Sequence, residues 1–263
     1  LGVPAYTFEL DDAFFQSCGS FEGDTLPKNI NALRYSARAL HAPYLLPKGP
    51  DTVVVDANGA DLVEIGTAVE ISAQLDSSRF RQGSPAEPVY AIASVNAYLD
   101  QLPWDTGASA MAMAAADGAF DSNSESATLS LNTTGWSSGR HFVHVQGVAT
   151  STGQAGTPNA AYVDVAAAGD IATLGGHVTA QASGAPLAAS VTVSNAATGE
   201  IRSADTNPAD GAYTRRMLAG NVAVHVSAPG YLDEDLPAVA LVGTQTTVRN
   251  FAMVSRCTVF EDA

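Results

Sequence analysis

The residue best suited to chemistry stands near the start of the chain, in the stretch Y-T-F-E-L at positions 6–10. Glu9 lies between Phe8 and Leu10. Side chains alternate between the two faces of a strand, so Thr7 and Glu9 share a face. A carboxylate held among apolar side chains can serve as a general acid or base. The other interpretation is an ordinary strand carboxylate that pairs with an arginine, and the pattern alone leaves both open.

Two histidines, His141 and His144, form the pattern H-x-x-H. The surrounding residues R-H-F-V-H-V-Q alternate between polar and apolar, as in a strand. Positions i and i+3 of a strand point to opposite faces, so the two rings do not share a metal easily. We therefore predict exposed strand histidines rather than a metal site.

Oxygen-bearing side chains cluster at Asp117, Asp121, Asn123 and Glu125, and these are the ligands that calcium prefers. The segment lacks the complete EF-hand pattern. An acidic turn between strands is favoured, and bound calcium is the weaker alternative. The same choice applies to the acidic run 233–235, which we predict to be a solvated loop.

The two cysteines, Cys18 and Cys257, lie near opposite ends of the chain. A disulfide between them is possible, and so is a bridge from Cys18 to another partner.

Trp104 and Trp136 are predicted to be core anchors, because aromatic side chains usually pack inside. If they were exposed, their rings could stack on sugars, which would suit a carbohydrate-binding sandwich.

Composition excludes several classes of protein. With 27 acidic and 12 basic residues among 263, the formal charge is −15, so a nucleic acid partner is not expected. No apolar run is long enough to span a membrane. The first residue is Leu1 and no leader pattern follows, which predicts a processed product or a fragment.

The pattern along the chain predicts a mainly β protein with one helix. Ile30, Leu33, Ala37 and Leu40 recur at helical spacing. Short alternating strands with Gly-rich turns follow and indicate two β-sandwiches. The predicted domains are a strand, loop and helix at 1–46, an Ig-like sandwich at 47–167, a second sandwich at 168–255 and a tail at 256–263.

The second sandwich resembles the carboxypeptidase regulatory-like, transthyretin-related domain. Its glycines stand where turns need positive φ, and its valines alternate into a core. The motifs that carry the resemblance are G-H-V at 176–178, G-A-P-L at 184–187, D-G-A-Y at 210–213, V-x-V-x-A-P-G-Y at 224–231 and N-F at 250–251.

The first 46 residues resemble the end of the catalytic domain of carboxypeptidase A-like zinc metallocarboxypeptidases. In that family the strand with the catalytic glutamate is followed by an aromatic-rich loop, a proline and a final long helix. Residues 11–40, D-D-A-F-F-Q-S-C-G-S-F-E-G-D-T-L-P-K-N-I-N-A-L-R-Y-S-A-R-A-L, supply these features in the same order.

This resemblance implies that Glu9 is the general base and acid that takes a proton from zinc-bound water. It implies that Thr7 lines the substrate pocket, and that Cys18 has a disulfide partner upstream. The family's zinc ligands, a His-x-x-Glu pair and a distant His, also lie upstream of the glutamate strand. No H-x-x-E occurs in this chain, and zinc catalysis needs about three protein ligands. We therefore expect the chain alone to be inactive.

Folding logic agrees, because the strand at 2–10 is apolar on both faces, as in a sheet covered by helices. An upstream catalytic portion or another chain should therefore cover residues 1–46. We predict the C-terminal portion of a secreted or periplasmic zinc metallocarboxypeptidase that acts on peptides. The alternative is a non-enzymatic extracellular β-sandwich module that binds, or self-assembles by strand addition.

Overall fold

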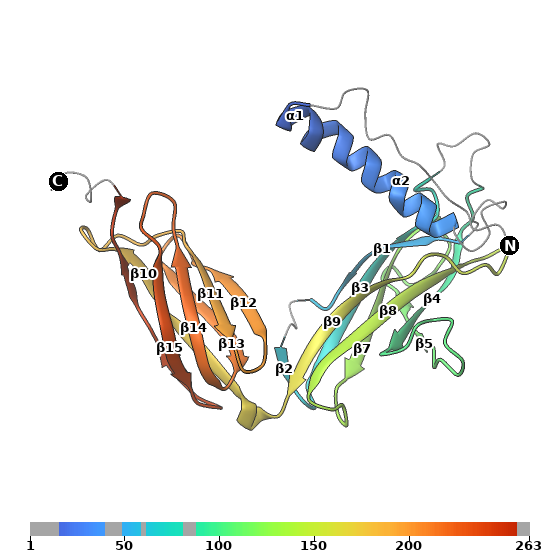
Figure 1. Cartoon of the computed structure of the whole chain (residues 1–263). Coiled ribbons are helices and arrows are strands. Elements are labelled where there is room, and N and C mark those ends of the chain that lie inside the picture. The colour runs from blue at the N-terminus through green and yellow to red at the C-terminus, as the bar shows by residue number, and fades with distance from the viewer. Residues whose placement is uncertain (1–15, 40–48, 59–61, 81–87, 257–263) are drawn as a thin grey trace, which may run out of the picture. The chain divides into compact units, whose positions relative to one another are not determined.

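The computed structural model describes residues 16–39, 49–58, 62–80 and 88–256 (Figure 1). It confirms a mainly β chain with β-sandwich architecture, as the alternation of apolar residues predicts. By density of contacts the chain divides into two compact units. Unit 1 is Leu1–Gly59, Val69–Leu131 and His141–Tyr162, and unit 2 is Ala60–Ala68, Asn132–Arg140 and Val163–Ala263. The predicted domain boundaries stay predictions.

The predicted helix is present. It begins with a short turn, α1 (Cys18–Ser20), in which the Ser17 hydroxyl accepts the Ser20 N–H at 3.1 Å, continues through a π-helical turn, η1 (Phe21–Thr25), and becomes α2 (Leu26–Ala39). None of the described helices is long and apolar enough to cross a membrane.

The first sandwich consists of two sheets, with strand orders β1-β3-β7-β6 and β2-β9-β8-β4-β5. Alternate residues of β3, such as Val69, Ile71 and Leu75, are buried, as its polar-apolar alternation predicts. Strand β2 and the last residues of β9 belong to unit 2. The strands are β1 (Asp51–Asp56), β2 (Leu62–Glu64), β3 (Ala68–Asp76), β4 (Ile92–Leu99), β5 (Met111–Ala112), β6 (Ala114–Ala115), β7 (Ser124–Asn132), β8 (Gly139–Ala149) and β9 (Asn159–Ala166).

The second sandwich lies wholly in unit 2 and follows a short 3₁₀ turn, η2 (Ala168–Asp170). One sheet has the order β12-β11-β14-β15, and the other has β13-β10-β16 with β17 also paired to β10. Its strands are β10 (Ile171–Ala180), β11 (Ser190–Asn195), β12 (Glu200–Asp205), β13 (Ala212–Leu218), β14 (Gly220–Ser227), β15 (Glu234–Leu241), β16 (Thr246–Val248) and β17 (Phe251–Met253).

Residues from both of these sheets share one core. Leu174 and Phe251 of one sheet pack with Val193 and Val224 of the other, and all four are buried. Tyr213 belongs to the same core. Its hydroxyl donates a hydrogen bond to the Arg249 carbonyl at 2.8 Å. Burial raises the pKa of Tyr213 to about 12.

The glycine of the motif D-G-A-Y, Gly211, occupies a position that requires this residue type. Gly211 has φ of +73°, and a Cβ at this position would lie 2.4 Å from the Val178 carbonyl oxygen. Any other residue would strain the turn and meet the neighbouring backbone.

Helix α2 is fixed to the first sandwich by its C-terminal half. The Arg38 Nε lies 2.9 Å from the Asp51 Oδ1, and each of these side chains is 5% exposed. Arg38 also donates to the Gly49 carbonyl at 2.6 Å. Its guanidinium lies 5.6 Å from the centroid of the Phe80 ring, on which the Tyr35 ring packs edge-on at 5.5 Å. The buried ion pair of Arg38 with Asp51 and the packing of Tyr35 on Phe80 therefore hold the helix against the first sandwich.

Replacing Arg38 tests this attachment. Arg38→Ala would deprive the buried Asp51 carboxylate of its guanidinium, which costs about 3–5 kcal/mol when a buried pair is broken. The expected result is a lower denaturation midpoint for unit 1, or loss of hydrogen-exchange protection along α2 if the helix detaches alone.

The matched control is Lys28→Ala on the same helix. Lys28 and Asp24 also form an ion pair, at 2.6 Å, but their side chains are 71% and 62% exposed. Exposed pairs contribute about 0–1 kcal/mol, so this variant should behave like the parent. Equal effects of the two substitutions would contradict the attachment described above.

Candidate functional site

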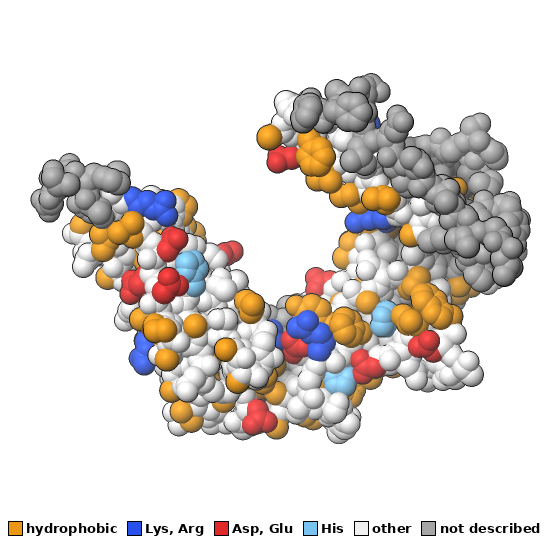
Figure 2. All heavy atoms as spheres, viewed as in Figure 1, with side chains coloured by type: hydrophobic (Ala, Val, Ile, Leu, Met, Phe, Trp, Pro, Cys, Tyr) orange, Lys and Arg blue, Asp and Glu red, His pale blue; other side chains and the backbone are white. Residues whose placement is uncertain are grey.

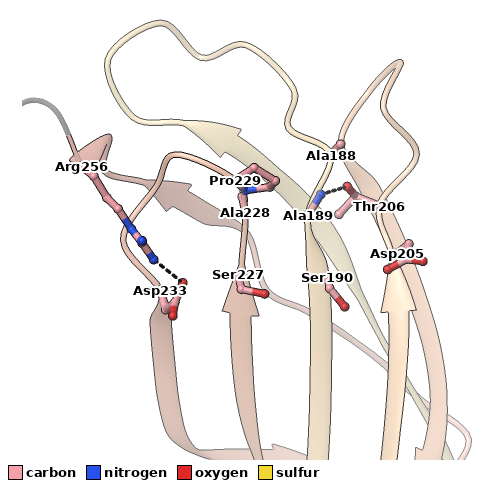
Figure 3. Close-up of a pocket in the computed structure, with 10 residues that line it drawn as sticks. All are labelled: Ala188, Ala189, Ser190, Asp205, Thr206, Ser227, Ala228, Pro229, Asp233 and Arg256. Carbon is pink, nitrogen blue, oxygen red and sulfur yellow. Dashed lines mark hydrogen bonds and ion pairs between the residues drawn. The ribbon is translucent and has the colours of Figure 1, made fainter. Parts of the chain in front are cut away.

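An open pocket of about 490 Å³ lies at one end of the sheet β12-β11-β14-β15 (Figure 3). Its lining combines small apolar side chains with hydroxyl groups and charges. The lining residues are Ala188, Ala189, Ser190, Asp205, Thr206, Ser227, Ala228, Pro229, Asp233 and Arg256.

Strand register places three polar side chains in a row across the pocket. Ser190 of β11 stands opposite Asp205 of β12 on one side and Ser227 of β14 on the other. The alternate positions, such as Val191 and Val226, face the core and are fully buried. Alternation along the strands therefore turns Ser190, Asp205 and Ser227 outward together.

The base of the pocket is held by a buried hydroxyl. Thr206 Oγ1 accepts the Ala189 N–H at 2.8 Å and donates to the Leu187 carbonyl at 2.6 Å. On the other side, Arg256 lies 3.6 Å from Asp233, and both side chains are about half exposed. Exposed pairs of this kind are weak, so this wall can rearrange around a ligand.

The described lining offers hydrogen-bonding and charged groups, but no serine that is paired with a base. A serine nucleophile needs a base within hydrogen-bond reach. The pocket lining contains neither histidine nor cysteine, and within the described ranges no hydrogen bond joins Ser190 or Ser227 to Asp205. The hydroxyls, the carboxylates and the guanidinium can bind a small polar group.

A second polar feature of unit 2 is a charged cluster formed by Arg140, Asp164, Glu200 and Arg202. Asp164 accepts two hydrogen bonds from Arg140, at 2.8 and 2.9 Å, and one from Arg202 at 2.7 Å. Arg202 also donates to Glu200. Burial would raise the pKa of the Asp164 carboxyl, but the hydrogen bonds and charges of the two arginines outweigh it and hold the pKa below 3.8. Asp164 is therefore an ion-pair partner and not a proton donor near neutral pH.

The residues predicted to act in peptide hydrolysis lie outside the described residues. This applies to Thr7 and Glu9, and the disulfide candidate Cys257 also lies outside the described residues. Cys18 begins α1, where its thiol is exposed and free. The roles of Glu9 and Thr7 and the pairing of the cysteines remain predictions.

The two histidines of H-x-x-H do point to opposite faces of β8, as predicted. His141 is 8% exposed and its Nδ1 lies 2.5 Å from Asp100 Oδ2. The prediction of exposure was therefore wrong for His141, because the aspartate partner makes its burial tolerable. His144 is half-buried on the outer face.

The acidic side chains considered for calcium are used in other ways. Glu125 is 5% exposed, and its Oε1 accepts the Asp121 N–H at 3.0 Å and the Ser122 N–H at 2.7 Å. Asp235 Oδ1 lies 2.8 Å from His225 Nδ1. In the part of the chain that is described, no three metal-ligating side chains gather. Bound calcium, the weaker alternative, stays untested.

Sequence reasoning missed the pocket, and it misplaced one tryptophan. The signal for the pocket was present, since the polar positions of S-V-T-V-S must face outward once the valines enter the core. Trp104 is 66% exposed, so its prediction as a core anchor was wrong. Trp136 is half-buried.

Comparison with known proteins assigns one part of the chain. Residues 173–254 match the carboxypeptidase regulatory-like domain, which confirms the resemblance of the second sandwich. No curated protein matches the chain.

Several solved structures share a low similarity with most of the chain. The Bacillus anthracis TIE protein is 13% identical with a TM-score of 0.30 over 87% of this chain, which spans 45% of that protein. The group B streptococcus pilus 2b backbone protein is 12% identical with a TM-score of 0.27, covering 80% of this chain and 99% of the other. The major pilin SpaD from Corynebacterium diphtheriae is 9% identical with a TM-score of 0.27, covering 79% and 65%. Similarity at this level carries no information about what this chain does.

The charged cluster generates a prediction about acid stability. Because the pKa of Asp164 is depressed in the folded protein, its contribution to stability is present above pH 3.8 and is lost as pH falls through the folded value. Asp164→Asn should lower the free energy of unfolding of unit 2 at pH 7 and should flatten its decline in acid.

Urea unfolding at a series of pH values measures this effect. Asp205→Asn is the matched control, because Asp205 is exposed and has no ion pair among the described residues. An acid profile of Asp164→Asn that parallels the parent profile would show that the cluster does not contribute.

Proposed function

We propose that this chain, whose residues 173–254 match the carboxypeptidase regulatory-like domain, is a non-enzymatic β-sandwich module that binds a larger partner through α2. The partner surface can belong to the same polypeptide or to another chain. The observation that carries the proposal is an apolar stripe on α2 that the described structure leaves exposed.

The apolar stripe consists of Leu26, Ile30, Leu33 and Ala37, which share one face of the helix. Leu26 is 39% exposed, Ile30 37% and Leu33 54%, and Ala37 is exposed as well. Figure 2 shows hydrophobic side chains along one side of this helix. An amphipathic helix in water normally turns such a stripe toward a core. An apolar stripe that is exposed to solvent therefore supports the presence of a partner surface that covers it.

The attachment of α2 prevents the stripe from turning inward. Tyr35 follows Leu26 by nine residues, which is about two and a half helical turns, so it lies opposite the apolar stripe. Tyr35 and Arg38 contact the first sandwich. The side of the helix that holds the module together is thus distinct from the side available for binding.

Self-assembly by strand addition has less support than binding through α2. Edge strand β15 contains Pro237, which cannot donate to a new ladder. Edge strand β1 has a register irregularity between Thr52 and Val54. Such features protect sheet edges from pairing. Edge strand β12 is more open, with Ile201 70% exposed.

The second candidate is that the partner surface is the catalytic domain of a zinc metallocarboxypeptidase that continues into this chain. Two observations favour it. Helix α2 occurs where the resemblance places the final helix of that domain, and its apolar stripe is uncovered. In the intact enzyme, Glu9 would move protons between water and the leaving amine, and zinc would supply a polarised water.

A location outside the cytoplasm, extracellular or periplasmic, is part of both candidates and rests on the acidic composition.

Replacing the stripe tests the proposed binding face. The isolated chain should associate in a concentration-dependent way and bind a hydrophobic dye, because the aliphatic side chains meet water. The triple variant Leu26→Gln, Ile30→Gln, Leu33→Gln should be monomeric in sedimentation velocity with unchanged helix content by circular dichroism, since glutamine is a good helix former.

Ile201→Gln is the matched control, because it removes an even more exposed aliphatic side chain from β12. It should leave association unchanged if α2 carries the binding. Association that Ile201→Gln abolishes would favour strand addition at β12 instead. A parent chain that stays monomeric and binds no more dye than the triple variant would contradict the proposal.

The second candidate has its own test in the gene. The coding sequence upstream of residue 1 should contain a His-x-x-Glu pair and a further histidine. The extended polypeptide should bind zinc and release C-terminal amino acids from peptides, and Glu9→Gln should abolish release while zinc stays bound. If these zinc ligands are absent upstream, the second candidate is excluded, and the proposal of a binding module is unaffected.

A further inference from the structure

Four rings lie together on the outer face of the five-stranded sheet, and we call them the ring platform. They are Tyr98 of β4, Phe142 and His144 of β8, and Tyr162 of β9, from three neighbouring strands of unit 1. Figure 2 shows hydrophobic side chains and histidine on this face of the sheet. Neither the second sandwich nor α2 contributes to the platform.

Strand geometry brings the rings together. Tyr98 stands opposite His144 in the antiparallel pair β4–β8. The Phe142 and His144 rings lie 6.2 Å apart between centroids, and the Phe142 and Tyr162 rings lie 6.5 Å apart, edge to face. Val143, between the two β8 rings, is fully buried, so the rings must occupy the opposite face.

The rings are exposed although they are large. Phe142 is 45% and Tyr162 43% exposed, and Tyr98 and His144 are half-buried. Contacts between the rings hold them in place, because edge-to-face packing is favourable. The result is a row of ring surfaces that solvent can reach.

Amide side chains form a second row beside the platform. Asn96 of β4 stands opposite Gln146 of β8, one outward position further along each strand. The Gln146 amide donates to the Gly156 carbonyl at 2.8 Å, which fixes its orientation. An amide group offers two donors and an acceptor, so this row can exchange hydrogen bonds with a ligand that lies on the rings.

One ring also has an unused hydrogen-bonding atom. The Nδ1 of His144 is buried and has no hydrogen-bond partner among the described residues. A buried polar atom of this kind is costly without a partner. That nitrogen is not accessible from solvent, so the exposed features of the platform are its ring faces and the neighbouring amides.

The size and charge of the platform narrow the class of ligand. Fully covered aromatic side chains bury about 150–250 Å² each, so four partly exposed rings offer on the order of 300 Å². A stable protein interface takes about 800 Å² per partner, which the platform does not provide. The net charge of −15 opposes phosphate-bearing ligands. A small or narrow ligand without negative charge remains, and a neutral one is favoured over a cation because neither the platform nor the amide row contains a carboxylate.

We propose that the ring platform binds a neutral carbohydrate chain. The pyranose ring of a neutral sugar has an apolar C–H face and a rim of hydroxyl groups. The C–H face stacks on Phe142 and Tyr162, and the hydroxyls hydrogen-bond to Asn96 and Gln146. This inference is independent of binding through α2, because it uses different residues and a different class of ligand.

Affinity electrophoresis in gels containing a soluble neutral polysaccharide tests the proposal. The probes are hydroxyethyl cellulose, mixed-linkage β-glucan and arabinoxylan, and anionic alginate is the charge control. At least one neutral polymer should retard the parent chain, and alginate should not. Phe142→Leu, which keeps an apolar side chain but removes the ring, should weaken binding about tenfold.

Two tyrosine variants sharpen the result. Tyr162→Phe keeps the ring and should retain most of the binding, whereas Tyr162→Leu should lose it. Thermal unfolding should be nearly unchanged, because the substituted side chains lie on the exposed face. Lack of retardation by every neutral polymer would overturn the proposal, and so would retardation that Phe142→Leu leaves intact. Association between copies of the chain that Phe142→Leu abolishes, without retardation, would assign the platform to a protein interface and would also overturn it.

Discussion

Arg38 fixes helix α2 to the first sandwich, and its position decides which face of the helix meets solvent. A guanidinium buried against Asp51 cannot leave without exposing a charge that has lost its partner. Tyr35 and Phe80 add ring contacts on the same side. Once these contacts form, the leucines and the isoleucine on the opposite side have no described surface to cover them. One side of α2 is therefore attached to the sandwich, and the apolar side is exposed.

The molecule offers three surfaces with different chemistry. The stripe on α2 is aliphatic and suits another protein surface. The ring platform joins aromatic faces to amides and suits a sugar. The pocket of the second sandwich combines hydroxyls with a loosely paired arginine, and it lacks the base that would make Ser190 or Ser227 reactive. Each surface is suited to recognition by contact, and among the described residues none of the three contains a complete catalytic set.

Much of the fold could be predicted from local patterns. Alternating valines predicted strands such as β11, and the spacing of Ile30, Leu33 and Ala37 predicted α2, because both follow from the geometry of single elements. Long-range pairing could not be predicted. Asp164 and Arg202 are far apart in sequence, and only the fold brings them together. The ring platform depends in the same way on strand register, which places Tyr98 beside His144.

The candidate catalytic residue illustrates a different limit. Glu9 drew attention through its neighbours and through a family resemblance, but it lies outside the described residues and its role stays a proposal. The exposure of the α2 stripe could be anticipated only in part, since a helical pattern states which side is apolar and not what covers it. The polar-apolar pattern of β8 likewise could not predict that Asp100 lies beside His141.

Hydrogen exchange with mass spectrometry, applied to this chain alone and to the protein purified from its native source, tests the central claim most directly. If the stripe is a binding face, the amides of Leu26–Ala39 exchange measurably more slowly in the native protein than in the isolated chain, where only the contacts of Arg38 and Tyr35 hold the helix, while β3 is protected equally in both. Equal protection of α2 in the two samples would contradict the claim, because it would mean that nothing covers the helix in its natural setting.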